Sequence, residues 1–444
     1  MKNFNTLLLL GMFFFTILIF SCKQKDQPKD ISSNKVAKLI SIDNPTELDS
    51  ILDGYVDRGS FPFIYARLEN LEGEVLYEHS TVNRDLFPDL EVDKDSWIRI
   101  WSMSKIITIS IALDLVEDGL LKLDDPVDKY IPEFKNLKVA KSADGENLTT
   151  VNRDNNELIC PLKYEPLDSV MTVLDLINHK AGFYYATTGI DCFDEMIAAE
   201  NLPTSKNADE FIERLSRLPL IMQPGSDEFY GINTTVLGFV AERVSGKSLK
   251  DLVKERVTGP LSINGLQYGL PLGSKLVPAV SGKDSVLRLA MQEELDIFGP
   301  DVPDYDMSHE LYLGGEGMVA NADGYADFVR MLVNHGTLNG KRFLDKMTVE
   351  DIYAPHTQLD NKYGYNGYNL WVSGDSMRIN GQGDAGLWIG GGYEGTSFWA
   401  DPKREFVGVI MTQMFMVPNG DYNRDNDFRG ALYRRIFEKE RKPN

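Results

Sequence analysis

The chain has 444 residues and a formal net charge of −21. So large an excess of acidic side chains argues against nucleic acid as a partner and against docking through a basic patch. The length left after a leader and a tether exceeds one ordinary hydrophobic core, which predicts two coupled subdomains. The five histidines are scattered through the chain and none has a metal-binding spacing, so we expect no metal and no other cofactor.

The first residues are typical of an export signal. Lys2 precedes an apolar run over residues 7–20, which is too short to span a membrane. The run ends at Cys22 in a segment that resembles a lipobox, although Phe20 replaces the small residue that is usual there. We therefore expect residues 1–21 to be a lipoprotein signal peptide and Cys22 to be lipidated. An ordinary secretory leader is the alternative.

The segment after Cys22 is polar. Residues 23–30 contain no hydrophobic side chain, which predicts a tether over 22–43 between a lipid anchor and a folded domain at 44–444. Lys23, by analogy with lipoprotein sorting, favours the outer membrane. We expect an exported protein that is held at a bacterial membrane by its lipid, in the periplasm or at the cell surface. Such an oxidising setting allows Cys160 and Cys192 to pair, and the sequence leaves their pairing open.

The N-terminal part of the folded domain predicts a helix followed by a hairpin. Asn44 and Pro45 are typical of a helix start, and this helix should run to about Val56. Residues 61–68 and 74–79 have the pattern of two strands around a turn. The helix that follows is apolar nearly all round, which indicates burial, and Gly119 stops it.

Ser102 and Lys105 stand at the head of that buried helix. Their spacing places both side chains on one face. Partial desolvation should make the lysine less inclined to hold its charge, so that it can accept the serine proton. The N–H groups of the helix start favour negative charge on a substrate oxygen. The pair therefore predicts a serine acyl hydrolase, whereas the same spacing at Ser32 and Lys35 has no apolar helix behind it and is read as coincidence.

The rest of the chain is helical in the middle and returns to strands. Helical spacing predicts four helices in the middle of the chain, at 175–178, 208–215, 236–244 and 324–334. Two strands follow at 396–400 and 406–412, and a closing helix at 425–440. Residues 134–167 look irregular. Strands at both ends predict one mixed, mostly antiparallel sheet drawn from about 44–118 and 336–440, with a helical part at about 119–335. We expect the active site in the cleft between the two.

Two further features carry possible chemistry. Tyr230 lies between a Pro-Gly turn and a helix, and a phenol beside a cation can relay a proton; a core tyrosine is the alternative. The run Gly390, Gly391 and Gly392 precedes a strand, where it would let a substrate lie along the strand edge and an N–H just after it donate to an oxyanion. A flexible turn is the alternative.

These segments, taken together and in order, resemble the serine β-lactamase-related superfamily, on the branch of class C β-lactamases, penicillin-binding protein-like proteins and their esterase relatives. The matching pieces are Ser102 to Lys105, residues 174–182, Pro224 to Tyr230, residues 236–238, residues 314–319, and the glycine run with residues 398–402. The resemblance covers about residues 45–440. It implies an α+β, β-lactamase/transpeptidase-like fold, with a central sheet flanked by helices and a helical subdomain.

The resemblance also implies roles for individual residues. Ser102 would be the nucleophile, Lys105 its base and Tyr230 the proton relay. The backbone N–H groups of Ser102 and Tyr393 would form the oxyanion hole, and Gly390 to Gly392 would bind substrate. His179 matches a family position and is expected to be structural.

Two departures from the β-lactamase pattern bear on the substrate. Ile232 stands where those enzymes have an asparagine, with Asn233 one position late, and Gly390 stands where a lysine opens their Lys-Thr-Gly motif. Both losses remove partners for a carboxylate beside the scissile bond. We therefore expect a small-molecule acyl ester as substrate. The alternatives are a β-lactamase or D,D-peptidase-like activity and a non-catalytic binding lipoprotein, and the sequence leaves the oligomeric state open.

Overall fold

A computed structural model describes residues 44–153, 159–291, 294, 297, 310–358 and 362–441. The expected signal peptide, Cys22 and the tether lie outside these residues. The described chain is built around an eight-stranded sheet with strand order β12-β13-β14-β15-β16-β17-β1-β2, in which each neighbouring pair is antiparallel. Its strands are β1 (Phe63–Asn70), β2 (Val75–Val82), β12 (Thr357–Gln358), β13 (Gly364–Asn366), β14 (Trp371–Ser373), β15 (Trp388–Gly391), β16 (Ser397–Asp401) and β17 (Phe406–Met411).

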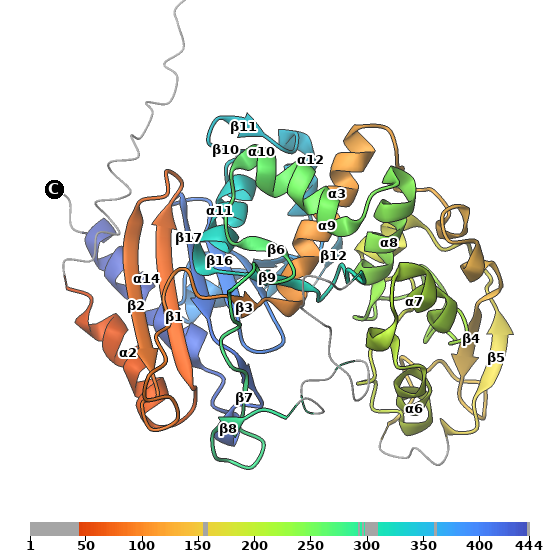
Figure 1. Ribbon diagram of the computed structural model, residues 1–444, viewed down its shortest axis with the longest axis horizontal. Coiled ribbons are helices and arrows are strands. Elements are labelled where there is room, and N and C mark those ends of the chain that lie inside the picture. Colours follow the sequence, from red (N-terminus) through yellow and green to blue (C-terminus); the bar gives the residue numbers. More distant parts are fainter. Residues whose placement is uncertain are drawn as a thin grey trace, which may run out of the picture.

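Both faces of this sheet are buried, and its strands alternate between the two. On β1, Ile64 and Ala66 join the core that also holds Leu48 and Phe428, whereas Phe63 and Tyr65 join the core on the opposite face. The first core is covered by α2 (Thr46–Asp57) and α14 (Arg424–Arg441), which lie side by side near the two ends of the described chain (Figure 1). The expected fold class, an α+β sheet assembled from both ends, is confirmed.

The opposite face carries the helices that position the site. Helix α11 (Ala322–Val333) packs on β1 and β17, and α3 (Ser104–Glu117) packs against α8 (Asn233–Ser245). The side chains of α3 from Ser104 to Leu113 are all buried, which explains why that helix is apolar all round. Glycine at 119, with φ +71°, lies just beyond its end, as the sequence predicts.

The remaining elements are short. The helices are α5 (Val173–Ile177), α6 (Asp191–Glu200), α7 (Ala208–Leu215), α9 (Leu249–Leu252), α10 (Gly259–Leu261), α12 (Lys346–Ile352) and α13 (Asp375–Ile379). The strands outside the large sheet are β3 (Ile98–Arg99), β4 (Lys138–Lys141), β5 (Lys163–Pro166), β6 (Leu266–Tyr268), β7 (Val280–Ser281), β8 (Arg288–Leu289), β9 (Met318–Ala320), β10 (Thr337–Leu338), β11 (Lys341–Arg342) and β18 (Met414–Phe415). Among the described residues, no helix has the length and apolar character needed to cross a membrane.

Two segments differ from the sequence-based expectation. Residues 134–167, which look irregular, contain the antiparallel pair β4 and β5. The glycine run is not a loose turn, because Gly390 and Gly391 form the end of β15 and pair with β16. Glycine has low strand propensity, so periodicity alone does not find this strand.

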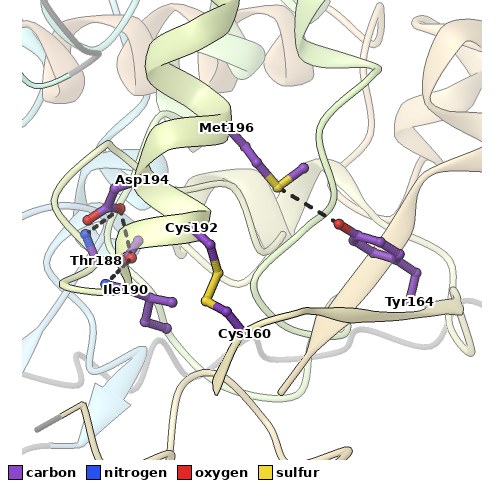
Figure 2. Close-up of a disulfide and its surroundings, with 7 residues drawn as sticks. All are labelled: Cys160, Tyr164, Thr188, Ile190, Cys192, Asp194 and Met196. Atoms are coloured by element: carbon purple, nitrogen blue, oxygen red, sulfur yellow. Dashed lines mark hydrogen bonds between the residues drawn. A yellow bond between two sulfur atoms is a disulfide. The ribbon is translucent and has the colours of Figure 1, made fainter. Parts of the chain in front are cut away.

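Cys160 and Cys192 form a disulfide. Figure 2 shows the bond joining the segment before β5 to the first turn of α6. The Tyr164 hydroxyl donates to the Met196 sulfur across the same contact, at 3.9 Å. The bond therefore fastens the β4–β5 hairpin to α6.

Replacing both cysteines with alanine is expected to lower the free energy of unfolding by about 2–4 kcal/mol, because the disulfide limits the freedom of the unfolded chain. Denaturant unfolding of the oxidised protein, the reduced protein and the double variant measures this. The reduced protein should match the variant. An unchanged free energy in both would show that the bond does not stabilise the fold.

Candidate active site

Ser102 lies in a single 3-10 turn, Trp101–Met103, directly before α3. Trp101 has φ +45°, a left-handed conformation that costs a non-glycine residue energy. Its side chain is fully buried and packs edge-on against the Tyr393 ring, 5.4 Å between ring centres. Packing of the indole thus holds a strained residue immediately before Ser102.

The glycine run allows β15 to approach this turn closely. A Cβ added to Gly392 would lie 2.5 Å from the Ile100 carbonyl oxygen, and one added to Gly390 would lie 2.4 Å from the Phe398 ring. Any side chain at these positions would push the strand away from its neighbours. The glycines therefore bring the end of β15 against the segment that carries Ser102.

The Ser102 oxygen meets the two other residues that the sequence singled out. The Tyr230 hydroxyl donates to Ser102 Oγ at 2.7 Å, and Lys105 Nζ donates to it at 3.1 Å. Lys105 Nζ also lies 5.0 Å from the centre of the Tyr230 ring. Tyr230 is half-exposed and is therefore not a core tyrosine. The fold brings all three residues together, although they come from two separate parts of the chain.

Lys105 is fully buried within a set of polar partners. Its Nζ donates to Tyr185 Oη at 2.9 Å, to the Gly315 carbonyl at 3.1 Å and to Glu316 Oε1 at 3.2 Å. Thr235 Oγ1 donates to the other Glu316 oxygen at 2.5 Å, and the Tyr185 hydroxyl also donates to Glu316. A buried ion pair with its remaining oxygens hydrogen-bonded can retain its charges.

The pKa of Lys105 is raised, not lowered as the sequence suggested. Burial is the largest single effect and acts to lower this pKa, but the negative charges available at Tyr230 and Glu316 together outweigh it. The expectation of a less readily charged lysine was wrong because it counted only desolvation. Lys105 is an ammonium group at rest.

Sequence reasoning missed Glu316, Tyr185 and Thr235. Glu316 lies in the glycine-rich segment 314–317, which the sequence marks only as part of the family pattern. A Cβ on Gly315 would lie 3.1 Å from both Lys105 Nζ and Thr235 Oγ1, so glycine there gives the network room. The sequence offers one sign of this role: Glu316 is a single acidic residue among three glycines, within a part of the chain that is otherwise predicted to be mostly helical.

His179 supports the Tyr230 ring. The two rings stack with centres 4.7 Å apart. His179 Nδ1 faces the Gly231 N–H at 3.4 Å and the Asn233 amide nitrogen at 3.2 Å, so it accepts and the ring proton sits on Nε2. Burial, followed by the charge of Lys105, lowers the pKa of His179 to about 3. The imidazole is therefore neutral, as a structural role requires.

Neither Ile232, which stands in place of the family asparagine, nor Asn233 beside it offers an amide to a substrate. Ile232 is fully buried in the core. Asn233 is also buried, and its Nδ2 faces His179 and the Phe183 carbonyl. Asn233, which lies one position after the family asparagine, thus holds His179 behind Tyr230.

A pocket of about 230 Å³ opens at Ser102. Its walls come from both sides of the cleft, with Tyr230 and Asn178 on one side and Asn366, Trp371 and the glycines of β15 on the other. Among the described residues that line it, Glu228 is charged and none is lysine or arginine. The described part of the chain also holds no group of three or more His, Cys, Asp or Glu side chains placed to bind a metal.

The residues expected to supply the oxyanion donors line two adjoining pockets. Ser102, Gly390 and Gly391 line this pocket, whereas Gly392 and Tyr393 line a second, adjoining one. Gly392 N donates to the Thr396 carbonyl at 2.8 Å. Because N–H groups alternate in direction along an antiparallel strand, the Gly391 N–H points away from β16.

A search of family models matches the Beta-lactamase family over residues 70–432. The chain belongs to the Beta-lactamase family. It is similar to Protein Rv1367c of Mycobacterium tuberculosis, with 26% identity over 83% of this chain and 89% of that protein. It is also similar to a lovastatin esterase of Penicillium rubens, with 25% identity over 87% of this chain and 98% of that protein.

Solved structures show the same fold. EstCE1, described as a hydrolase with promiscuous acyltransferase activity, matches with a TM-score of 0.70 and 20% identity, over 90% of this chain and 100% of that one. Unliganded simvastatin synthase from Aspergillus terreus matches with a TM-score of 0.68 and 18% identity, over 91% of this chain and 100% of that one.

Proposed function

We propose that the protein is a serine hydrolase that cleaves carboxylic esters of small molecules through a covalent acyl-Ser102 intermediate. The observation that carries this proposal is the contact of Ser102 Oγ with both Tyr230 and Lys105 at the mouth of a pocket. Similarity to an esterase and to a hydrolase with acyltransferase activity supports acyl chemistry.

In the proposed mechanism, Tyr230 relays protons beside Lys105, which stays charged because its pKa is raised. As Ser102 Oγ attacks the ester carbonyl, the Tyr230 oxygen takes the serine proton and its own hydroxyl proton passes to the departing alcohol, which leaves an acyl-serine. Water then attacks the acyl carbon. The Tyr230 oxygen takes the water proton while its hydroxyl proton returns to Ser102 Oγ, and the acid departs.

The developing oxyanion needs two donors. We assign one to the Ser102 N–H, at the start of the turn before α3. The other is the Gly391 N–H in place of Tyr393, because Gly391 lines the Ser102 pocket and its N–H points away from the β15–β16 ladder. Gly390 and Gly391 would then hold the acyl group along the strand edge.

The pocket favours an ester without a charge beside the scissile bond. Such a carboxylate, present in β-lactams and D-alanyl peptides, would meet Glu228 and none of the cations that lysine or arginine would provide among the described lining residues. Leaving an anion unpaired in a partly closed site is costly. Neutral acyl esters carry no such penalty.

Replacing Tyr230 with phenylalanine is expected to slow ester turnover by about 10²–10³, the range typical of a general acid–base group. The ring and its stacking on His179 remain, so the variant removes one oxygen. Steady-state kinetics on a chromogenic ester measure the change, with Tyr363→Phe as a matched control, because the Tyr363 side chain is also half-exposed and lies outside both pockets. An unaffected rate would remove Tyr230 from the mechanism.

The substrate class is tested by offering a chromogenic short-chain ester and a chromogenic cephalosporin to the same preparation. We expect turnover of the ester and little of the cephalosporin. Faster turnover of the cephalosporin would contradict the ester proposal and favour a β-lactamase. Activity on neither, with no labelling by a serine-reactive phosphonate, would favour a binding protein.

We propose further that the chain is anchored by a lipid on Cys22. The support is the apolar run before Cys22 and the polar stretch after it. Cys22→Ala is expected to move the protein from the membrane fraction to the soluble fraction of cells that express the full chain. Lys23→Ala is a matched control and should stay with the membrane. Membrane association of the Cys22 variant would contradict the anchor.

A further inference from the structure

A second and larger pocket adjoins the Ser102 pocket. Its volume is about 820 Å³, and the two pockets share Trp371, Ile389, Gly390 and Gly391 as lining residues. The second pocket continues past the turn between β15 and β16 to residues 414–417 and to the first turns of α14. A ligand whose reactive end lies at Ser102 therefore has room to extend across the glycines of β15.

Among the described residues, no carboxylate forms a direct ion pair with the buried guanidinium of Arg429 in this pocket, although the charge of Asp425 is nearby. Arg429 is 5% exposed, its Nη2 donates to the Asn426 side-chain oxygen at 2.9 Å, and its Nε has no hydrogen-bond partner among the described residues. Burial lowers the pKa of Arg429 despite the nearby charge of Asp425. The Trp399 ring centre lies 5.9 Å from the guanidinium carbon. A buried guanidinium with one hydrogen-bond partner and one aromatic ring nearby has lost more hydration than the protein restores.

The neighbouring charges leave an excess of one positive charge. Arg424 also lines the pocket, but it pairs with Asp425 at 2.7 Å and lies over the Phe61 ring, 4.7 Å from its centre. The other titratable group facing Arg429 is the Tyr433 hydroxyl, which stays neutral because burial raises its pKa well above the usual value. Two arginines and one aspartate thus attract an anion in a chain that is otherwise strongly acidic.

Much of the remaining pocket lining is apolar, while Thr396 and Ser397 add hydroxyl groups. Phe61, Met414, Phe415 and Val417 line it together with the Tyr422 ring. A guanidinium donates two parallel hydrogen bonds to a carboxylate, while such walls favour a hydrocarbon skeleton. The chemistry that fits both is an organic acid with one carboxylate on an apolar body.

We propose that this pocket binds a carboxylate at the far end of the ester substrate, so that the enzyme hydrolyses half-esters of apolar dicarboxylic acids. This inference rests on the proposed ester hydrolase activity. It agrees with the absence of lysine and arginine among the described residues that line the Ser102 pocket, because the apolar body separates the substrate charge from the scissile bond. The arginine would then select substrates without touching the reacting atoms.

The test compares nitrophenyl half-esters, from succinate to sebacate, with neutral nitrophenyl alkanoates of equal chain length. For the half-ester length that spans the two pockets, we expect kcat/KM to exceed that of the neutral ester by about 10- to 100-fold, as for a charge-assisted hydrogen bond. Arg429→Gln should bring this ratio to one or below, and Arg429→Lys should keep part of it. Taking the ratio within each variant cancels any loss of folded protein.

Met416→Glu gives a second variant that does not disturb a buried residue. Met416 is half-exposed and lines the same pocket, so a carboxylate there should repel the substrate anion and lower the same ratio. A wild-type ratio of one at every chain length, with the neutral esters hydrolysed, would overturn this inference and leave the ester proposal standing. The inference is also overturned if neither Arg429→Gln nor Met416→Glu changes the ratio of half-ester to neutral-ester kcat/KM.

Binding without turnover separates the two proposals. Calorimetric titration of Ser102→Ala with decanoate should show binding that Arg429→Gln in the same background weakens by about tenfold or more. Decanol is the neutral control and should bind equally to both. If no ester is hydrolysed but decanoate binds through Arg429, the ester proposal fails and the anion site stands. Equal decanoate affinity of Ser102→Ala with and without Arg429→Gln would overturn the proposed anion site.

Discussion

Ser102→Ala is expected to lower ester turnover by a factor on the order of 10⁴–10⁶, as the loss of a covalent nucleophile does in other serine hydrolases. The variant removes the oxygen that contacts both Tyr230 and Lys105. It leaves the network around Glu316 in place, so the folded state should be retained. Initial rates on a chromogenic ester, with thermal unfolding as a check on folding, measure both effects.

Ser110→Ala is the matched control for this substitution. Ser110 is buried on the same helix, and its hydroxyl donates to the Ile106 carbonyl at 2.7 Å, a bond within α3 that does not reach the site. This variant should keep wild-type turnover. Residual activity of more than a few per cent in a contaminant-free preparation of Ser102→Ala would contradict the assignment of Ser102 as nucleophile.

Lys105→Ala is expected to reduce turnover nearly as far as Ser102→Ala, and to destabilise the protein as well. The ammonium, whose pKa is raised, stabilises the negative charge that develops on the Tyr230 oxygen while that oxygen relays protons. Its removal also leaves Glu316, which is fully buried, with hydroxyl partners instead of a cation. Breaking one side of a buried ion pair costs about 3–5 kcal/mol. Kinetics and denaturant unfolding test the two effects separately.

The double variant Lys105→Ala and Glu316→Gln separates catalysis from stability. Removing both charges should restore much of the lost free energy of unfolding, because no buried charge is left uncompensated. Turnover should stay as low as in Lys105→Ala. Recovered turnover in the double variant would show that Lys105 serves only to neutralise Glu316.

The raised pKa of Lys105 also fixes the pH range of this stabilisation. A basic group whose pKa is higher in the folded protein than in the unfolded chain stabilises the fold. This stabilisation is complete at pH values below the unfolded-chain pKa, which is 10.5 for lysine. It is lost as the pH rises through the pKa of the folded protein. The difference in unfolding free energy between the wild type and the double variant should therefore be constant around neutral pH. A loss of that difference between pH 6 and 8 would contradict a charged Lys105.

Local sequence patterns predicted the hairpin of β1 and β2, the buried helix α3 and the closing helix α14, because each rests on neighbouring residues. Strand β15 was missed because glycine has low strand propensity. Gly390 of β15 closely approaches Phe398, and Gly392, just after the strand, closely approaches Ile100. The disulfide also could not be read from spacing, because it depends on where α6 packs.

The site shows the same division between local and distant partners. Ser102 and Lys105 are neighbours on one helix, so their contact follows from their spacing. Glu316 is 211 residues from Lys105 in the sequence, and together with Tyr230 it raises the pKa of Lys105 against the effect of burial. Only the packed structure brings that carboxylate to the lysine.

The central claim, an acyl-serine intermediate, is tested most directly by intact-protein mass spectrometry after rapid mixing with a slowly hydrolysed ester and acid quenching. We predict a mass increase equal to one acyl group, located on the peptide that contains Ser102, absent from Ser102→Ala and retained in Ser110→Ala. Ester turnover without any adduct under conditions that trap the intermediate in a known serine esterase, or an adduct on another residue, would contradict this account.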